Sequence, residues 1–297
     1  MSRLGELTAL TGLAFDEPMA RHTSWRVGGP ADVYFRPENI ADLRRFLQAI
    51  ERGTPLHWVG LGSNLLVRDG GVRGAVINTQ RVFNRLEHEA PYRVHAGAGI
   101  ACTQLARRVS AWGLGPAAFF AGIPGTVGGA LTMNAGAFGG ETWDHVEFVT
   151  VIDRDGQLNK RLPADFSVAY RDVHGPADEW FTEACFGFSA AAPNDAEEMR
   201  ELLARRKASQ PLGLPSCGSV FRNPAGDHAA RLIEAAGLKG ERLGGAVVSP
   251  KHANFIINAG DASAADIESL IETVRSTVAD RHGVELQHEV RIIGEAA

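Results

Sequence analysis

The stretch AGIPGTVGGALTMNAGAFG, residues 121–139, indicates more than any other segment what this chain is built to hold. It has no charged side chain, and its glycines stand at 122, 125, 128, 129, 136 and 139. Such a run is a poor core segment, because glycine buries little surface and loses much chain entropy on folding. We interpret it as backbone laid against a large flat or anionic ligand; a packed glycine-rich loop is the alternative. The run 121–139 predicts neither a regular helix nor a strand.

A second glycine-rich turn, GLGSNLLV at 60–67, opens from the run of a buried strand at 56–62. Such a turn can direct successive backbone N–H groups into one concavity, which suits a phosphate. It departs from a dinucleotide-binding fingerprint at Leu65, and the chain has no Gly-Lys-Ser/Thr of a P-loop. A phosphate cradle and a plain turn between two strands both remain open here.

The overall composition narrows the class of protein. Hydrophobic residues make up 44% and charged residues 22% of the 297, as in a globular protein of two or three packed units. A net charge of −5 argues against nucleic acid as a partner. Three widely separated cysteines build neither a metal site nor a disulfide framework, so we expect no metal and a reducing compartment. Without a signal peptide or an apolar run of about 18 residues, we expect a cytoplasmic protein without membrane contact.

Hydrophobic periodicity predicts a mixture of strands and helices. Strands are expected at 31–37, 56–62, 74–79, 92–99, 181–189, 253–260 and 284–294, and a hairpin turns at Asp155-Gly156. One helix is expected over 40–50 with Gly53 as its C-cap, and others are capped by Thr103, by Asn194 or Asp195, by Asp227 and by Ser263 with Asp266. The expected fold class is α+β in three lobes, with boundaries near 85 and 195.

Two segments near the C-terminus carry candidates for chemistry. In SCGSVFRNP, 216–224, Ser219 could protonate a carbanion or enolate, and a cap or turn residue is the alternative. In HEVRIIG, 288–294, Glu289 and Arg291 would share one strand face. Aimed into a pocket, that pair could stabilise charge on an enol carboxylate; a surface ion pair is the alternative.

Taken together, the motifs resemble the UDP-N-acetylenolpyruvoylglucosamine reductase family. The links, in order, are HTSWRVGGPAD, VGLGSNLLV, AGIPGTVGGALTMNAGA, AYRD, SCGSVFRNP, GERLGGAVVSPKHANFIIN and HEVRIIG, over 22–295. The resemblance implies an FAD-binding fold of the vanillyl-alcohol-oxidase type. Its two α/β lobes would be 1–85 and 86–195, a third, substrate-binding α+β lobe 196–285, and a C-terminal strand, 286–297, would pack back on the first lobe.

The resemblance also assigns roles to particular residues. The catalytic residues are Ser219, Arg171 and Glu289. The residues implied to bind FAD are Gly60, Gly62, Ser63, Asn64, Leu65, Gly122, Ile123, Pro124, Gly125, Thr126, Gly128, Gly129, Asn134, Gly136 and Arg291. The substrate contacts implied are Tyr170, Arg222, Asn223 and His252, and for His252 a structural role in the third lobe is the alternative.

The chemistry that the resemblance implies has two halves. NADPH delivers hydride to the flavin N5 and leaves. UDP-N-acetyl-3-O-(1-carboxyvinyl)-glucosamine then takes hydride from N5 at its vinyl carbon and a proton from Ser219, which gives UDP-N-acetylmuramate for peptidoglycan. Arg171 and Glu289 would stabilise or orient the enolate-like species. No obligate protein partner is implied.

Three departures qualify this resemblance. Ser209 stands where many relatives carry lysine, so Arg205, Arg206 or Lys207 would have to compensate. The short span between Arg171 and Ser219 is typical of the shorter subclass, which lacks the inserted substrate-covering loop. Cys217 is either a small packing residue or a thiol close enough to the flavin to be alkylated. Two further functions stay open: a flavin oxidase of the same cofactor fold, and a flavin-binding protein without turnover.

Overall fold

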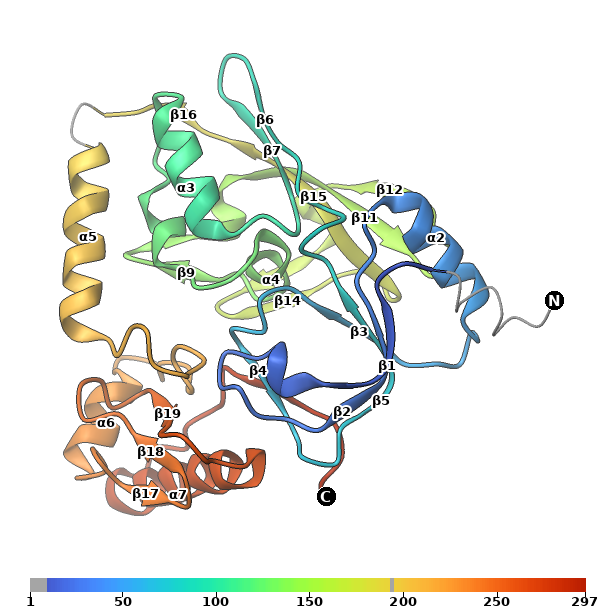
Figure 1. Ribbon diagram of the computed structural model, residues 1–297. Helices are drawn as coiled ribbons and strands as arrows, with labels where there is room; N and C mark the ends of the chain where they lie inside the picture. Colours follow the sequence, from blue (N-terminus) through green and yellow to red (C-terminus); the bar gives the residue numbers. More distant parts are fainter. Residues whose placement is uncertain (1–9, 193–194) are drawn as a thin grey trace. The chain divides into compact units, whose positions relative to one another are not determined.

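The computed structural model describes residues 10–192 and 195–297 (Figure 1). The chain divides into two compact units. Unit 1 runs to Phe15 and continues with 33–60 and 74–205, while unit 2 comprises 16–32, 61–73 and 206–297. Three of the limits fall inside strands β1 (Leu13–Pro18), β2 (Pro30–Phe35) and β5 (Val72–Asn78), and another falls inside helix α5 (Asp195–Ser209). With β3 (Leu56–Val59) these strands form a sheet of order β1-β2-β5-β3. The three-lobe division stays a prediction.

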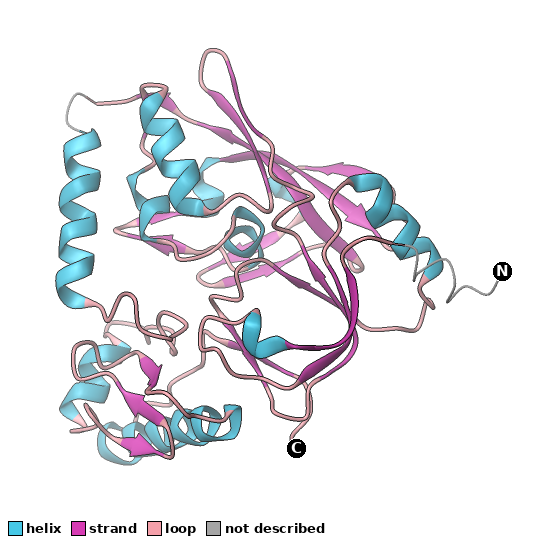
Figure 2. Cartoon of the chain, viewed as in Figure 1, coloured by secondary structure: helices cyan, strands magenta, loops and turns pink. Residues whose placement is uncertain are grey.

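Unit 1 is built largely on an antiparallel sheet of order β12-β11-β15-β7-β6 (Figure 2). Its strands are β6 (Leu86–Glu89), β7 (Arg93–Gly97), β11 (Val146–Asp153), β12 (Leu158–Arg161) and β15 (Glu179–Gly187). The predicted hairpin is confirmed, because β11 pairs with β12 around Gly156, whose φ is +81°. Smaller pairs are β8 (Leu114–Gly115) with β16 (Ser189–Ala190), β9 (Gly136–Ala137) with β10 (Gly140–Glu141), and β13 (Ser167–Ala169) with β14 (Asp172–His174).

Helices of unit 1 cover two hydrophobic clusters. The helices are α2 (Ile40–Ala49), α3 (Cys102–Ala111), α4 (Val127–Thr132) and the 3₁₀ turns η2 (Ala118–Gly122), η3 (Thr142–His145) and η4 (Pro163–Asp165). Leu43, Phe46 and Leu47 of α2 pack with Phe35 in one cluster, while Leu105 and Val109 of α3 belong to the other. The predicted absence of regular structure around 121–139 is wrong at α4, because Val127, Ala130 and Leu131 bury one face of that short helix.

Unit 2 has its own core around helix α7 (Ala264–His282). Its other elements are η1 (Met19–Arg21), β4 (Leu65–Val67), α6 (Ala229–Ala235), β17 (Arg242–Leu243), β18 (Ala246–Val248), β19 (Ile256–Asn258) and β20 (Arg291–Ile293), while α5 (Asp195–Ser209) leads into it. The indole Nε1 of Trp25, which is fully buried, donates to the Ile256 carbonyl at 2.7 Å. The strand β20 pairs in parallel with β4, Arg291 opposite Leu65, so the C-terminal segment joins a strand from the first quarter of the chain.

The helix ends test the predicted caps. The capping box of Ser263 with Asp266 is confirmed at the start of α7. Three other caps are wrong: α2 ends at Ala49 rather than near Gly53, Thr103 lies inside α3 behind Ala101, and His228 rather than Asp227 precedes α6. Of the two candidates before α5, Asn194 lies outside the described residues, and Asp195 begins the helix.

The first turn of α7 is capped a second time, by a loop distant in sequence. The Asp69 carboxylate accepts the N–H groups of Ala264 and Ala265, each at 2.9 Å. We expect Asp69→Ala to lower the free energy of unfolding by about 1–2 kcal/mol, because two amide donors lose a charged acceptor at a helix N-terminus. Asp69→Asn, which keeps an oxygen acceptor, should lose less. Urea unfolding of both variants measures the difference; an Asp69→Asn variant as stable as the wild type would contradict a charge contribution, and equal losses in the two variants would contradict a contribution from the oxygen acceptor.

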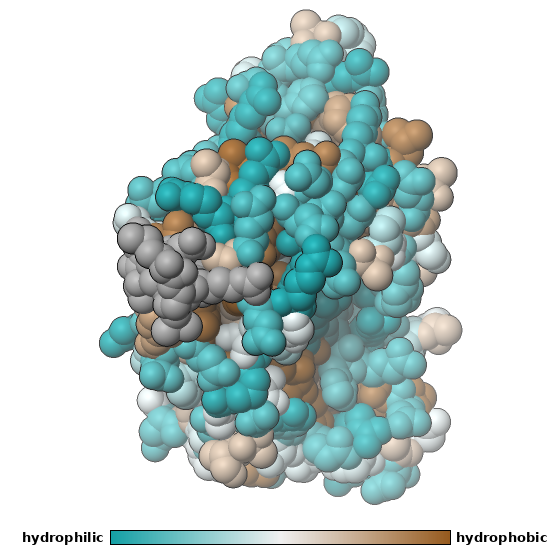
Figure 3. All heavy atoms as spheres, turned by 90° about the vertical axis from the view of Figure 1, so that its right-hand side faces the viewer, coloured by the Kyte–Doolittle hydropathy of each residue, from teal (hydrophilic) through white to brown (hydrophobic). Residues whose placement is uncertain are grey.

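The surface drawn in Figure 3 is mostly hydrophilic, with small and separate hydrophobic spots. Among the described residues no helix combines the length and the apolar character needed to cross a bilayer.

Candidate active site

Within unit 1, the two glycine-rich runs meet. A Cβ built on Gly60 would lie 2.4 Å from Oγ1 of Thr126, so only glycine allows this approach. Asn78, buried on β5, donates from Nδ2 to the Gly60 carbonyl at 3.2 Å and so fixes the position of the turn. Gly60 and Thr126, two of the residues predicted to bind FAD, are therefore in contact although they are distant in sequence.

The glycines of the 121–139 run divide into two kinds. Gly122 and Gly136 are required by the chain's own packing, because added Cβ atoms would meet Ala137 Cβ at 2.5 Å and Gly140 O at 2.4 Å. Gly129 is exposed, and a Cβ there would meet only Thr126 Oγ1, at 3.7 Å. Packing does not explain that glycine, whereas close approach of a ligand does. Its N–H already donates to Thr126 Oγ1, the cap of α4, so it is the open space at this glycine that fits a cofactor such as FAD.

Arg171 is anchored on the end of the same glycine-rich run. Its Nη1 and Nη2 atoms donate to the carbonyls of Asn134 and Gly136, both at 2.9 Å. The guanidinium carbon also lies 4.8 Å from the centre of the Tyr170 ring. Arg171 has a φ of +56°, in the turn between β13 and β14, and its side chain is only 12% exposed. Its direction is thus set by the backbone that is predicted to hold the cofactor.

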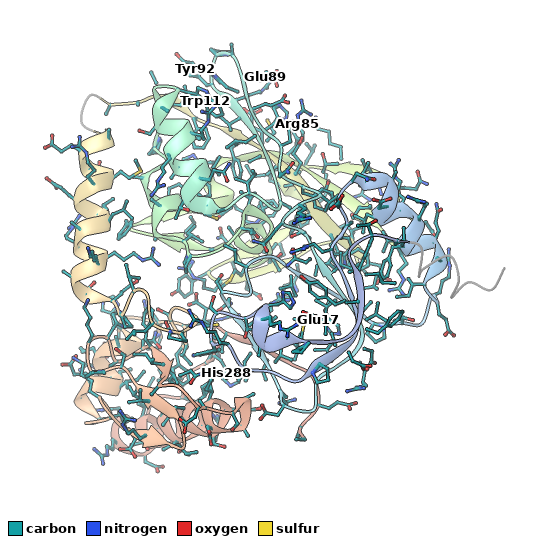
Figure 4. The ribbon with its side chains drawn as sticks, viewed as in Figure 1. Glu17, Arg85, Glu89, Tyr92, Trp112 and His288 are labelled. Carbon is teal, nitrogen blue, oxygen red and sulfur yellow. The ribbon has the colours of Figure 1, made fainter. Side chains whose placement is uncertain are left out.

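In unit 2, the rest of the first glycine-rich turn meets the C-terminal segment. Gly62 has a φ of +62°, and a Cβ there would lie 2.0 Å from the His22 carbonyl oxygen, so glycine is required. The His22 ring is held in turn by Glu17, labelled in Figure 4, at 2.9 Å. Asn64 donates from Nδ2 to the Glu289 carbonyl at 3.0 Å and accepts the Arg291 N–H at 3.0 Å on its own carbonyl.

Ser219 and Glu289 belong to two backbone segments that pair. The Glu289 N–H donates to the Val220 carbonyl at 2.7 Å, and the Arg222 N–H donates to the Gln287 carbonyl at 2.9 Å. His288, labelled in Figure 4, lies opposite Phe221 between these two bonds. The predicted strand face shared by Glu289 and Arg291 is wrong in one respect, because β20 begins only at Arg291. The chain changes partner there, from 220–222 to β4.

Asn254 holds the Ser219 segment from the other side. It is 3% exposed, and its amide both accepts the Phe221 N–H at 2.9 Å and donates to the Phe221 carbonyl at 2.8 Å. Its own carbonyl accepts the Val220 N–H at 2.9 Å. Sequence reasoning missed Asn254, although it stands in the motif PKHANF beside His252.

Two of the predicted substrate contacts carry buried nitrogen atoms without a protein partner. Among the described residues, neither Nε of Arg222 nor Nδ1 of His252 has a hydrogen-bond partner. Burial first, and the Lys239 charge second, lower the pKa of His252, so its imidazole is neutral at pH 7. Unsatisfied buried polar atoms are costly, and a polar ligand is one way to satisfy them.

The other two predicted substrate contacts are placed differently. Asn223 is exposed, and its Oδ1 accepts the Ala229 N–H at 3.1 Å, which caps α6. Tyr170 is 44% exposed beside Arg171. Of the possible substitutes for the absent lysine at Ser209, Arg206 is partly buried, which lowers its pKa, and its Nε donates to Gln210 at 2.9 Å. Arg171 belongs to unit 1, whereas Ser219, Glu289, Arg222 and His252 belong to unit 2.

Cys217 is a packing residue. It is 2% exposed, its Sγ lies 3.6 Å from the carbonyl oxygens of Gly62 and Leu65, and burial raises its pKa to about 12. The alternative of an alkylatable thiol is therefore disfavoured, because the thiolate is the reactive form.

We expect Cys217 to resist iodoacetamide at pH 8 in the folded protein and to react once guanidinium unfolds it, as peptide mass spectrometry would measure. The raised pKa of Cys217 also determines in which direction the stability of the protein changes with pH. The buried neutral thiol contributes its full stability below about pH 9 and loses about 1.4 kcal/mol per pH unit from there toward 12. Labelling of Cys217 in the folded protein at pH 8 would contradict this burial.

Comparison with known proteins gives two family matches and several similar proteins. A family model described as FAD binding domain matches residues 31–160, so the chain carries the FAD-binding part of a flavoprotein. A second, described as the C-terminal domain of UDP-N-acetylenolpyruvoylglucosamine reductase, matches residues 210–293. The reductase of that name from Alkalilimnicola ehrlichii is 60% identical over 94% of both chains, and that from Methylococcus capsulatus is 55% identical over 94% of this chain and 92% of its own. The chain belongs to the UDP-N-acetylenolpyruvoylglucosamine reductase family.

A solved structure supports the same assignment. The UDP-N-acetylenolpyruvylglucosamine reductase from Thermus caldophilus matches with a TM-score of 0.81 at 32% identity, over 94% of this chain and 97% of its own. The predicted family, the α+β fold class with an FAD-binding domain, and FAD as cofactor are thereby confirmed.

Proposed function

We propose that this protein reduces UDP-N-acetyl-3-O-(1-carboxyvinyl)-glucosamine to UDP-N-acetylmuramate with NADPH, using bound FAD, in the synthesis of peptidoglycan precursors. The observation that carries the proposal is the pairing of 287–289 with 220–222. It brings the segments of Ser219 and Glu289 together inside the region matched by the family's C-terminal domain. A flavin-binding protein without turnover has no use for such a pair beside a cofactor.

The FAD is held, in this proposal, by the two glycine-rich runs and their neighbours. The residues are Gly60, Gly62, Ser63, Asn64, Leu65, Gly122, Ile123, Pro124, Gly125, Thr126, Gly128, Gly129, Asn134, Gly136 and Arg291. The contact of Gly60 with Thr126 and the open position at Gly129 support this set. When bound, FAD supplies the two-electron redox chemistry between NADPH and the vinyl group of the substrate.

Ser219 donates the proton that completes the reduction. As the terminal vinyl carbon gains a hydride, the electron pair of the double bond moves toward the carboxylate, and the inner carbon becomes basic. The Ser219 hydroxyl protonates that carbon, and a solvent proton restores the hydroxyl, so a methyl group and a new C–H bond form. A hydroxyl is a feeble acid in water, but transfer to an enolate carbon runs downhill.

Cationic and polar side chains of the protein bind the negatively charged groups of the substrate. Arg171 stabilises the negative charge that develops on the carboxylate, because a guanidinium with a fixed direction loses little by reorganisation. Glu289 orients the groups around the reacting carbons. Arg222 offers its buried Nε–H to an oxygen atom of the sugar nucleotide, and the buried Nδ1 of His252 donates or accepts there according to its tautomer, while the exposed Asn223 and Tyr170 contact the substrate from its outer side.

The proposed protein has two FAD-binding lobes and a substrate-binding lobe, and it works in the cytoplasm. FAD-binding lobes at 1–85 and 86–195 and a substrate lobe at 196–285 agree in outline with the spans of the two family matches. A cytoplasmic location is supported by the reliance on NADPH, a co-substrate of that compartment. No protein partner is required for the reaction.

Product analysis tests the proposal. Protein supplied with FAD, NADPH and the enolpyruvyl sugar nucleotide should consume NADPH and yield a product heavier by two hydrogens. Proton NMR should lose the vinyl signals and gain a methyl doublet. NADPH consumption that yields hydrogen peroxide and leaves the vinyl signals intact would indicate a flavin oxidase instead.

A further inference from the structure

The Glu141 carboxylate contacts two residues of the proposed site at once. Its Oε1 lies 3.5 Å from Nη1 of Arg171, and its Oε2 accepts a hydrogen bond from Nδ2 of Asn134 at 2.7 Å. Glu141 is partly buried, with a side chain 34% exposed, and all three residues belong to unit 1. No role was predicted for Glu141 from the sequence.

Asn134 is the residue through which this carboxylate reaches the backbone. It is 3% exposed and has a φ of +44°, a conformation that a residue other than glycine keeps only when its surroundings hold it. Its Oδ1 accepts the Trp143 N–H at 3.1 Å, and its Nδ2 also points to the Ala169 carbonyl at 3.4 Å. Because the Asn134 carbonyl receives Nη1 of Arg171, whatever fixes Asn134 also fixes the guanidinium.

A tight hairpin brings Glu141 back beside one of the carbonyl groups that bind Arg171. Gly136 of β9 lies opposite Glu141 of β10, and a Cβ on Gly136 would meet the Glu141 Cγ at 3.1 Å. The Gly136 carbonyl accepts Nη2 of Arg171 at 2.9 Å. Two carbonyls and one carboxylate from a single hairpin therefore define the plane of the guanidinium, whose fork of donors has a fixed geometry.

We infer that Glu141 is a positioning residue for Arg171, acting by its ion pair with the guanidinium and by its hydrogen bond to Asn134. The inference rests on the proposed function, in which Arg171 stabilises the charge that develops on the substrate. It adds a carboxylate that never meets the substrate but sets where the positive charge stands.

Half-reaction kinetics of three variants test this role. In Glu141→Ala, flavin reduction by NADPH should stay within about twofold of wild type, whereas reoxidation by the enolpyruvyl substrate should slow by about tenfold or more. Glu141→Gln should lie between, because it keeps the acceptor for Asn134 and loses the charge facing Arg171. Glu147→Ala is the matched control: its carboxylate accepts from Nε of Arg93 at 2.7 Å, so it removes a glutamate–arginine pair of unit 1 that contacts neither Asn134 nor Arg171, and both half-reactions should keep wild-type rates within about twofold.

Two further measurements separate positioning from a general structural role. Calorimetry of oxidised Glu141→Ala should show substrate binding weakened by about tenfold with unaltered FAD content, whereas Glu141→Gln, which keeps the acceptor for Asn134, should also keep the melting temperature of the wild type. In an Arg171→Ala background, Glu141→Ala should slow reoxidation by less than about twofold more, since the residue acts through Arg171.

Three results would overturn the inference. Equal slowing of both half-reactions, or a full tenfold further loss in the Arg171→Ala background, would remove the positioning role. A glutamine variant with wild-type kinetics would remove the ion pair from it. Failure of the substrate to reoxidise the wild-type protein would instead remove the proposed function, and the inference with it.

Discussion

Replacing Ser219 by alanine is expected to leave flavin reduction by NADPH within about twofold and to slow reoxidation by the enolpyruvyl substrate by about 10²–10⁴-fold. The first half-reaction moves no proton to substrate carbon, so it does not need the hydroxyl. The second half-reaction ends with the transfer of that proton. Alanine also leaves the backbone pairing of Val220 with Glu289 in place, because that bond uses only main-chain atoms.

Anaerobic stopped-flow traces at the flavin absorbance band measure both rates. Ser216→Ala is the matched control, since Ser216 lies three residues upstream, with its hydroxyl bonded at 3.4 Å to the Leu214 carbonyl. Its two rates should equal those of the unmodified protein. Equal slowing of both half-reactions in Ser219→Ala would contradict a role as proton donor.

Replacing Glu289 by glutamine should produce the same asymmetry, with reoxidation slowed by about 10²-fold. Glutamine keeps the size of the side chain, and the main-chain bonds to Val220 and Asn64 remain. Only the charge that orients donors around the reacting carbons is lost. Glu285→Gln is the control, because that exposed carboxylate faces Arg275 at 2.6 Å, away from the Ser219 segment. Reoxidation kinetics of Glu289→Gln equal to those of the control would remove Glu289 from the mechanism.

Much of the fold follows from local pattern. Strands such as β5 and β15 and the amphipathic helix α7 carry strong periodicity, and their own residues decide them. The caps that failed depend on distant partners. The N–H at the start of α3 donates to the Gly125 carbonyl at 2.9 Å, so no side-chain cap at Thr103 is needed. The Asn223 side chain accepts the Ala229 N–H at the start of α6 from six residues upstream, further than an N-cap residue normally lies, so Asp227 is not required as the N-cap.

The same distinction holds for the site. The glycine-rich runs are visible because composition alone makes them poor core, and Ser219, Arg171 and Glu289 stand in motifs that resemble one family. Asn254 and Glu141 act through contacts with Phe221 and Arg171, and no local pattern marks such partners. At Gly122 and Gly136, packing against Ala137 and Gly140 already requires glycine, so the residue type alone does not indicate a ligand there, and their place in the proposed FAD site rests on the family resemblance.

The most direct test of the account is the absorbance spectrum of the FAD-loaded protein under anaerobic conditions, first with NADPH and then with the enolpyruvyl sugar nucleotide. The account predicts flavin bands that bleach with NADPH and return when the sugar nucleotide is added, in stoichiometric amount. Bands that stay bleached with the sugar nucleotide and return only with oxygen would contradict it.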